Sequence, residues 1–421
     1  MASLKYWIWL TTRSGVGHEA AFRLLEHFGT PESAYFADPG EYELTGLPCQ
    51  ARQALEDKSL DRAEHILADC ERLGVRVLTF QDAEYPERLR QIPYPPCALY
   101  VKGQLFSFDE ELAVAVVGSR RPTPYGVRMA GRLGLDLARR GVLLVSGIAQ
   151  GIDCTALKGA LAGGGRVVSV LGGGVDVHYP PQNRDLYDDV AAVGALISEY
   201  PPGTEPEGWH FPVRNRIISG LSLGVAAVEA GEGSGTLITA RLALEQNREV
   251  FAFPGPADAP MSRGTNKLIQ RGEAKLILSA EDVLSEFALL YPHRLREAEP
   301  LSAEDEAERL EAVLEGKTGE KTGEKPPRVE KNRGQSPEKE VDKGQKRAYI
   351  TLKEGDGAWT DDERDILLAL GGRTLHPDEL VEATGIPARR VLSALTMLQL
   401  RGYVEERPGK RFEALVLLRT D

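Results

Sequence analysis

Residues 113–126 read AVAVVGSRRPTPYG and carry the clearest signal of the fold class. Its apolar run ends at Gly118, a Gly-Ser-Arg turn follows, and the residues beyond the turn suit a helix as far as Arg140. A short continuous apolar run that stops at a glycine turn is typical of a strand buried on both faces of a parallel sheet. A strand, a tight turn and a helix in this order predict one unit of an α/β domain.

The same alternation of apolar runs and helix-compatible segments repeats further along the chain. We expect additional strands at residues 142–146, 166–171, 195–199, 224–229 and 249–253. Such a series predicts a doubly wound, Rossmann-like parallel sheet with helices on both faces. A strand at residues 75–80 and the proline-rich run that ends at residue 103 are expected to form an extended lead-in to this sheet.

Composition places this α/β domain between two smaller units. The chain has 421 residues, of which 42% are hydrophobic and 27% charged, which is enough apolar material for more than one core. Residues 291–357 contain the repeat KTGEKTGEK and few large apolar side chains, so we expect a disordered, charged linker there. The expected domains are a helical unit at 1–70, the α/β domain at 71–290 and a small C-terminal unit at 358–421.

Simple counts exclude several classes of protein. The formal net charge is −12, so the chain is no polycation that coats nucleic acid along its whole length. The four cysteines are scattered without a C-x-x-C pair, which argues against a disulfide scaffold or a zinc ribbon. No apolar run reaches the length of a membrane span, and no signal-peptide cleavage pattern follows the first apolar residues. We therefore expect a cytoplasmic protein with no membrane partner.

Glycine- and serine-rich turns follow several of the expected strands. The carboxyl ends of parallel strands meet at one edge of a sheet, and turns that expose backbone N–H groups at a helix N-terminus there bind anions. A single glycine after a strand is commonly only a tight turn, whereas several that converge favour a phosphate-binding rim. The residues expected to form this rim are Gly118, Ser119, Arg120, Ser146, Gly147, Gly172, Gly173, Ser234, Gly235 and Thr236.

The rim lacks the signatures of two common nucleotide-binding folds. No G-x-G-x-x-G follows the first strand and no G-x-x-x-x-G-K-[ST] occurs, so a dinucleotide site and a P-loop are both excluded. Arg120 stands where a pyrophosphate would need bare backbone. A guanidinium at this position suits a phosphate that it can hold through two hydrogen bonds, and the alternative is an ordinary surface ion pair.

The segment WHFPVRNRIISG, residues 209–220, places aromatic side chains among arginines just before an amphipathic helix. Single-stranded nucleic acid binds such combinations because its bases stack on the rings while guanidinium groups meet the phosphates. In the alternative interpretation the phenylalanine packs beneath the sheet edge and the arginines pair with carboxylates such as Glu199. The residues expected to contact nucleic acid are Phe211, Arg214, Asn215 and Arg216.

Four acidic residues near strand ends are candidates for acid–base catalysis. No nucleophile accompanies them, no G-x-S-x-G elbow occurs, and the seven histidines lack H-x-H and H-E-x-x-H spacing. Structural pairing with nearby arginines is the favoured interpretation, so we predict a protein that is not an enzyme and uses no metal or cofactor. The four residues are Asp153, Asp176, Glu199 and Glu229.

Five consecutive motifs resemble one known family. They are VAVVGSRRPTPYG, SGIAQGIDCTALKGAL, VLGGGVDVHYPPQN, FPVRNRIISGLS and EGSGTLITARLALEQNREVFAFPG, in the order and spacing of the DprA/Smf family. The resemblance covers about residues 85–278. It implies an extended Rossmann domain that binds single-stranded DNA in natural transformation and recombination, forms a homodimer and loads the RecA recombinase onto the strand.

The resemblance also implies roles for individual residues. The turn at residues 118–120 and the segment 211–216 resemble the family's DNA-binding pocket. The run RGTNKLIQRGEAKLI, residues 263–277, resembles its oligomer-forming region. A lysine that commonly binds phosphate ahead of the family's phenylalanine is absent here, where residues 206–208 read Pro-Glu-Gly. The residues assigned to a dimer interface by this resemblance are Asn266, Leu268 and Ile269.

Two other functions stay open at this point. The LOG-like phosphoribohydrolases have the same fold and similar glycine-rich loops, but their P-G-G-x-G-T-x-x-E signature carries a catalytic glutamate where this chain has Thr239. A scaffold with a vestigial site would bind neither DNA nor a nucleotide. The missing acid favours DNA binding over nucleotide hydrolysis.

The flanking units carry weaker signals. The G-x-G-x-x-x-A spacing from Gly15 to Ala21, with a degenerate copy at residues 46–51, resembles the SAM-like or helix-hairpin-helix appendage of this family. Within residues 358–421, three helices and a hairpin predict a winged helix, with Arg389 and Arg390 near the start of its third helix. The sequence leaves open whether either unit contacts DNA or protein.

Overall fold

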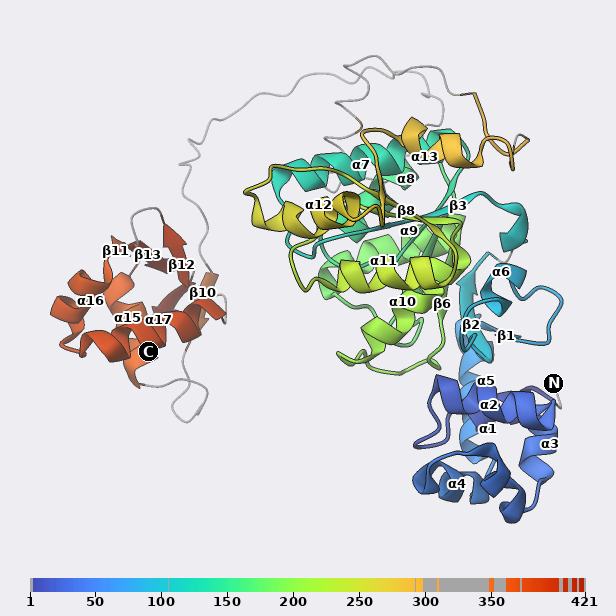
Figure 1. The fold of residues 1–421 in the computed structure, drawn as a ribbon. Coiled ribbons are helices and arrows are strands. Elements are labelled where there is room, and N and C mark those ends of the chain that lie inside the picture. The colour runs from blue at the N-terminus through green and yellow to red at the C-terminus, as the bar shows by residue number, and fades with distance from the viewer. Residues whose placement is uncertain are drawn as a thin grey trace, which may run out of the picture. The chain divides into compact units, whose positions relative to one another are not determined.

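The computed structural model describes residues 3–104, 106–291, 293–297 and 309, and the C-terminal segments 348–351, 361–371, 373–400, 404–407, 411–414 and 416–419. The chain divides into two compact units, residues 1–323 and residues 324–421. The first unit contains a large sheet with its covering helices and a helical N-terminal part, and the second is a small mixed unit (Figure 1).

Nine strands form the sheet of the first unit, in the order β1-β2-β6-β5-β4-β3-β7-β8-β9. The seven strands from β6 to β9 in this order are parallel to one another, and the chain reverses its direction of travel across the sheet at β3. The doubly wound, Rossmann-like α/β fold is thus confirmed. The bounds are β1 Arg76–Thr79, β2 Ala98–Gly103, β3 Ala113–Val117, β4 Leu143–Ser146, β5 Val167–Leu171, β6 Ala195–Ser198, β7 Gly224–Ala227, β8 Glu249–Ala252 and β9 Lys275–Leu276.

The lead-in to the sheet differs from the expectation. The end of the proline-rich run forms β2, an inner strand that pairs antiparallel with β1 on one side and with β6 on the other. Tyr100 lies opposite Val77 in β1 and opposite Ser198 in β6. Because its partners are distant in sequence, this strand is stabilised by tertiary pairing that no local pattern announces.

Helices cover both faces of the sheet, and β3 shows how the faces are divided. Val114 and Val116 face the core beneath α7, α8, α9 and α13, whereas Ala115 and Val117 face the core beneath α10, α11 and α12. This alternation is the two-residue period of a strand that is buried on both sides. The helix bounds are α6 Glu87–Arg90, α7 Pro124–Arg139, α8 Ile152–Ala162, α9 Arg184–Val193, α10 His210–Leu221, α11 Gly235–Glu245, α12 Arg263–Gln270 and α13 Ala280–Phe287.

The N-terminal part is helical, as predicted, but it has no core of its own. Its buried residues Trp7, Ile8 and Leu10 belong to the same apolar cluster as Tyr100 and Leu112 of the sheet. The last helix of this part also continues past the expected boundary at residue 70. The elements are α1 Leu4–Thr11, α2 His18–Phe28, α3 Pro31–Phe36, the 3-10 helix η1 Pro39–Thr45, α4 Cys49–Glu56 and α5 Asp61–Leu73.

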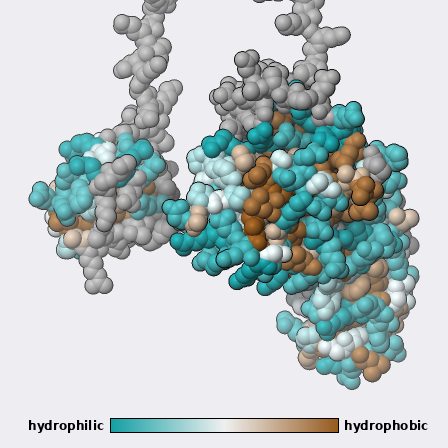
Figure 2. Space-filling model, turned by 45° about the horizontal axis from the view of Figure 1, so that its top comes forward, coloured by the Kyte–Doolittle hydropathy of each residue, from teal (hydrophilic) through white to brown (hydrophobic). Residues whose placement is uncertain are grey.

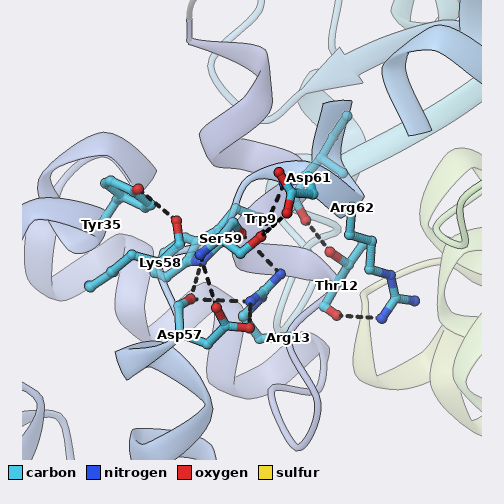
Figure 3. Close-up of polar contacts among 10 residues, drawn as sticks. Trp9, Thr12, Arg13, Tyr35, Asp57, Lys58, Ser59, Asp61 and Arg62 are labelled. Carbon is cyan, nitrogen blue, oxygen red and sulfur yellow. Dashed lines mark hydrogen bonds and ion pairs between the residues drawn. The ribbon is translucent and has the colours of Figure 1, made fainter. Parts of the chain in front are cut away.

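The loop between α4 and α5 holds the N-terminal helices together (Figure 3). The Trp9 indole donates to the Asp57 carbonyl at 2.9 Å, and Arg13 pairs with the Asp57 carboxylate at 2.7 Å. The Tyr35 hydroxyl donates to the carbonyl of Lys58 at 2.7 Å, and the ammonium of Lys58 lies about 5 Å from the ring centres of Trp9, Tyr35 and Tyr42. These contacts connect α1, α3 and η1 to one loop.

The second unit has the expected winged-helix elements, which confirms that prediction. Three helices pack around Leu380, Val391 and Leu398, and a three-stranded sheet has the order β11-β13-β12. An additional parallel pair, β10 with β14, was not predicted. The bounds are β10 Ala348–Thr351, α15 Asp361–Leu370, β11 Thr374–Leu375, α16 Pro377–Thr384, α17 Ala388–Leu400, β12 Val404–Arg407, β13 Arg411–Ala414 and β14 Val416–Arg419.

The predicted disordered linker at residues 291–357 is wrong at both of its ends. Residues 348–351 form β10, and at the other end Arg296 donates its backbone N–H to the carbonyl of Arg140 at 2.9 Å. Apart from residues 291, 293–297, 309 and 348–351, the predicted linker lies outside the described residues. Among the helices that the structure describes, none is both long and apolar enough to cross a bilayer.

Candidate nucleic-acid interface

A pocket of about 590 Å³ opens at the carboxyl edge of the sheet, next to the point where the strand order reverses. The turn after β3 forms one wall, the start of α11 after β7 forms another, and the start of α10 forms a third. Doubly wound sheets bind their ligands in this position because the loops diverge there. The predicted residues that line the pocket are Gly118, Ser119, Arg120, Phe211, Arg214, Asn215, Ser234, Gly235 and Thr236.

The turn after β3 is shaped by close packing. A side chain at Gly118 would come within 2.7 Å of the Ile152 side chain, so the turn can approach α8 only with glycine at this position. The Ser119 hydroxyl accepts the backbone N–H of Arg121 at 3.0 Å, which fixes the turn. Arg120 is exposed, and its guanidinium carbon lies 4.9 Å from the centre of the Phe211 ring. The turn therefore presents a cation over an aromatic face.

Two guanidinium groups lie within 6 Å of the centre of the Phe211 ring, those of Arg120 and Arg214. The guanidinium carbon of Arg214 lies 5.8 Å from the ring centre. Arg214 is only 4% exposed, whereas Arg120 is exposed. Its Nη1 donates to the carbonyl of Gly147 at 3.0 Å and to that of Val170. Burial lowers the pKa of Arg214 to about 10, so this guanidinium remains charged at neutral pH. The pocket thus has a fixed positive charge near its aromatic ring.

The N-terminus of α11 forms another wall of the pocket. Ser234 caps this helix, since its hydroxyl accepts the backbone N–H of Thr236 at 3.2 Å and donates to the Thr236 hydroxyl at 3.0 Å. The first backbone N–H groups of a helix lack intrahelical partners and carry the positive end of the helix dipole. An anion in the pocket would meet these groups together with the charges of Arg120 and Arg214.

Several predicted rim residues lie next to the pocket rather than in it. Gly147, Gly172 and Gly173 line a small hollow against Phe211 and Tyr179. Ser146 is fully buried and donates its hydroxyl to the carbonyl of Val116 at 2.7 Å. The predicted contact of Ser146 with a ligand is therefore wrong, because its side chain serves the interior of the sheet.

The predicted contact of Arg216 with nucleic acid also needs correction. Its guanidinium nitrogen lies 2.6 Å from both carboxylate oxygens of Glu199, and the residue is only 6% exposed. Of the two interpretations of the sequence, pairing of this arginine with Glu199 is the one that the structure shows. Residues two apart on a helix point about 200° away from each other, so Arg214 and Arg216 leave α10 on different sides. Arg216 has no access to a phosphate in the pocket.

The residues assigned to a dimer interface lie largely inside the protomer. The Asn266 side chain bonds both the N–H and the carbonyl of Gly255, at 3.1 and 3.0 Å. Leu268 is only 7% exposed, and the partly buried Ile269 packs against the same core. Apolar surface is visible on the first unit among hydrophilic residues (Figure 2). Two exposed leucines near the edge strand β9, Leu276 and Leu278, are 44% and 68% exposed.

The acidic candidates for catalysis all have structural partners. Glu199 pairs with Arg216, and Glu229 accepts the backbone N–H of Thr123 at 2.8 Å and its hydroxyl at 2.5 Å. Asp176 accepts the backbone N–H of Gly203 at 2.8 Å, and the buried Asp153 accepts that of Gly147 at 3.2 Å. In the part of the chain that the structure describes, no group of three or more His, Cys, Asp or Glu residues is arranged to hold a metal ion.

Two further aromatic residues lie in or beside the pocket. Tyr179 is not among the residues that the sequence predicts for the site, and Trp209 lies in the segment 209–220 but is not predicted to contact nucleic acid. Tyr179 lines the pocket, is 44% exposed, and has its ring centre 5.7 Å from that of Phe211. Trp209, beside the start of α10, is 60% exposed. The sequence could have indicated Tyr179 as another residue at the carboxyl edge, since it lies in the loop that begins with the triple glycine after β5.

Comparisons with known proteins agree with the geometry. Residues 76–288 match the family model described as DNA recombination-mediator protein A, and residues 353–410 match the DprA winged helix domain. Protein Smf of Synechocystis is 33% identical over 97% of this chain and 98% of its own length. DNA processing protein DprA of Bacillus subtilis is 43% identical over 52% of this chain and 74% of its own length.

A solved structure supports the same assignment. DNA processing protein A of Streptococcus pneumoniae is 34% identical and superposes with a TM-score of 0.60 over 67% of this chain and 97% of that chain. The family model spans the sheet and the pocket described above, and the Synechocystis relative matches almost the entire length. The chain therefore belongs to the DprA/Smf family of DNA-processing proteins.

Proposed function

We propose that this chain binds single-stranded DNA in the pocket at the carboxyl edge of its sheet, and that it does so in natural transformation and recombination. The observation that carries the proposal is that the Phe211 ring and the guanidinium groups of Arg120 and Arg214, 4.9 and 5.8 Å from its centre, line one pocket with the N-terminus of α11. An aromatic face among fixed positive charges suits a nucleotide, because the base stacks while the phosphate meets the cations.

The same arrangement favours a single strand over a duplex. Phe211 lies inside the pocket, where only a base that has left the stack of a helix can reach its face. The positive groups of the pocket address the phosphate and sugar backbone, which is the same in every sequence. We therefore expect a strong preference for single strands and a weak preference among bases.

We also propose that the protein acts as a homodimer and loads the RecA recombinase onto the strand. We place this activity in the cytoplasm. Family membership supports these three statements, and the exposed Leu276 and Leu278 at the edge of the sheet offer apolar surface for a second copy. Sedimentation equilibrium tests the dimer: a Leu278→Asp variant should shift a wild-type dimer to monomers. RecA filament growth on strands covered by a single-strand-binding protein tests the loading.

The decisive experiment is a titration of a fluorescently labelled dT oligonucleotide with the full chain, followed by anisotropy. Unlabelled dT strand should displace the probe, whereas the matching duplex and AMP should not. Displacement by AMP at similar concentrations, without binding of the strand, would refute the proposal and favour a nucleotide-hydrolysing relative. That second function has little support here, because the pocket carries Thr239 in place of a carboxylic acid.

A further inference from the structure

Trp209 is an exposed aromatic residue that the pocket does not use. It is 60% exposed, whereas the other tryptophans that the structure describes, Trp7 and Trp9, are 4% and 0% exposed. It directly precedes α10, between Gly208 and the Phe211 turn of the helix, and both of these neighbours line the pocket. An indole therefore stands in solvent immediately beside the proposed DNA site.

The indole is held in place rather than free to rotate. Its Nε1 donates to the Glu207 carboxylate at 2.7 Å. Its ring meets the His210 ring edge to face, with centres 4.1 Å apart and planes at 72°. His210 is itself fixed, because its ring stacks on Tyr200 at 4.0 Å and its Nδ1 is hydrogen-bonded to the Gly172 carbonyl at 2.8 Å. The exposed side chain is thus preorganised by its own chain.

This arrangement fits one kind of ligand better than others. The polar edge of the indole is satisfied by Glu207, so what remains accessible is apolar ring surface without a free hydrogen-bond donor. The carboxylate beside it repels phosphates and offers nothing to attract them. A planar, weakly polar group that stacks, such as a nucleobase, matches this surface, and stacking works with any base.

Continuity with the pocket identifies the source of that base. Trp209 and Phe211 are two positions apart at the start of α10, so they point to nearly opposite sides of the helix N-terminus. Gly208, the chain neighbour of Trp209, lines the pocket, so a strand that leaves the pocket at Gly208 would pass beside the indole.

We propose that Trp209 is a second base-stacking platform, which receives a nucleotide that neighbours the one in the pocket. This inference rests on the proposed function and extends it to a site outside the pocket. In this chain the segment ahead of Phe211 reads Glu-Gly-Trp-His and contains no lysine, so the interface gains affinity here by stacking and not by charge.

The test combines affinity with its salt dependence. Trp209→Ala should weaken binding of a dT oligonucleotide by about fivefold to tenfold, in the lower part of the range for base stacking on an aromatic residue. The slope of log affinity against log salt concentration should stay unchanged, because no phosphate contact is lost. Trp209→Phe should recover much of the affinity. Phe36→Ala is the matched control, since Phe36 is also an exposed aromatic residue at 68% and lies in α3.

Intrinsic fluorescence gives an independent readout. In a full-length Trp359→Phe background, Trp209 is the exposed tryptophan, and its emission should be quenched when a saturating dT oligonucleotide stacks a base on it. Normal strand binding with unquenched emission, or with unchanged affinity in Trp209→Ala, would overturn the stacking platform alone. Absence of strand binding by the wild-type protein would instead overturn the proposed function, and this inference with it.

Discussion

Replacement of Arg120 by alanine probes the proposed DNA site directly. The guanidinium stands exposed at the mouth of the pocket, 4.9 Å from the Phe211 ring centre, and forms no ion pair with another described side chain. The close packing of Gly118 against Ile152 and the capping of α11 by Ser234 do not involve the Arg120 side chain. The substitution should therefore remove one charge from the pocket without unfolding it.

The expected magnitude follows from one lost phosphate contact. A hydrogen bond to a charged group contributes about 1.5–3 kcal/mol, and the exposure of Arg120 places it at the lower end. A loss of about 1.5 kcal/mol corresponds to about tenfold weaker binding. Each phosphate neutralised on a single strand contributes about −0.7 to the slope of log affinity against log salt concentration, so the slope should become shallower by about 0.7.

Fluorescence anisotropy with a labelled dT oligonucleotide, repeated from about 50 to about 300 mM salt, measures both quantities. Arg120→Lys is the matched control: it keeps the charge and hence the slope, but loses the planar group that lies over Phe211 and so binds more weakly than wild type. An Arg120→Ala protein whose slope equals that of the wild type would refute the placement of a phosphate at this residue.

Three further outcomes are expected. Arg216→Ala should keep the wild-type salt slope but lower the free energy of unfolding by about 3 kcal/mol, because it leaves Glu199, whose side chain is only 12% exposed, without its partner; a wild-type denaturant midpoint would contradict this. Burial lowers the pKa of His18, and the charge of Arg216 lowers it further while that of Glu199 opposes the shift. The unfolded chain therefore protonates His18 more readily than the folded chain does. The free energy of unfolding should decline as the pH falls below about 6.5. His18→Gln should then flatten the decrease in Tm between about pH 7 and about pH 5, and an unchanged pH profile would count against it. A chain that ends after residue 297 should bind the dT strand about as tightly as the full chain, since every pocket residue belongs to the first unit; a large loss of affinity would show that the second unit takes part.

Local patterns in the sequence are sufficient to predict the architecture of the α/β domain. The apolar runs at residues 113–118, 142–146 and 166–171 specify buried parallel strands because a strand covered on both faces needs apolar side chains at every position. The turns after them had to gather at one edge, since all parallel strands end there. The position of the pocket and the part of its lining in the turns after β3 and β7 follow from these two rules without any knowledge of tertiary contacts.

Which side chains reach the pocket depends on tertiary contacts. Arg214 and Arg216 look equivalent in the sequence, but the orientation of α10 against the sheet directs one toward Phe211 and the other toward Glu199. Strand β2 likewise exists because β1 and β6 flank it, although its own proline-rich approach resembles a loop. Local pattern encodes periodicity and turns, whereas the direction of a side chain and the partner of a strand depend on contacts between residues far apart in the chain.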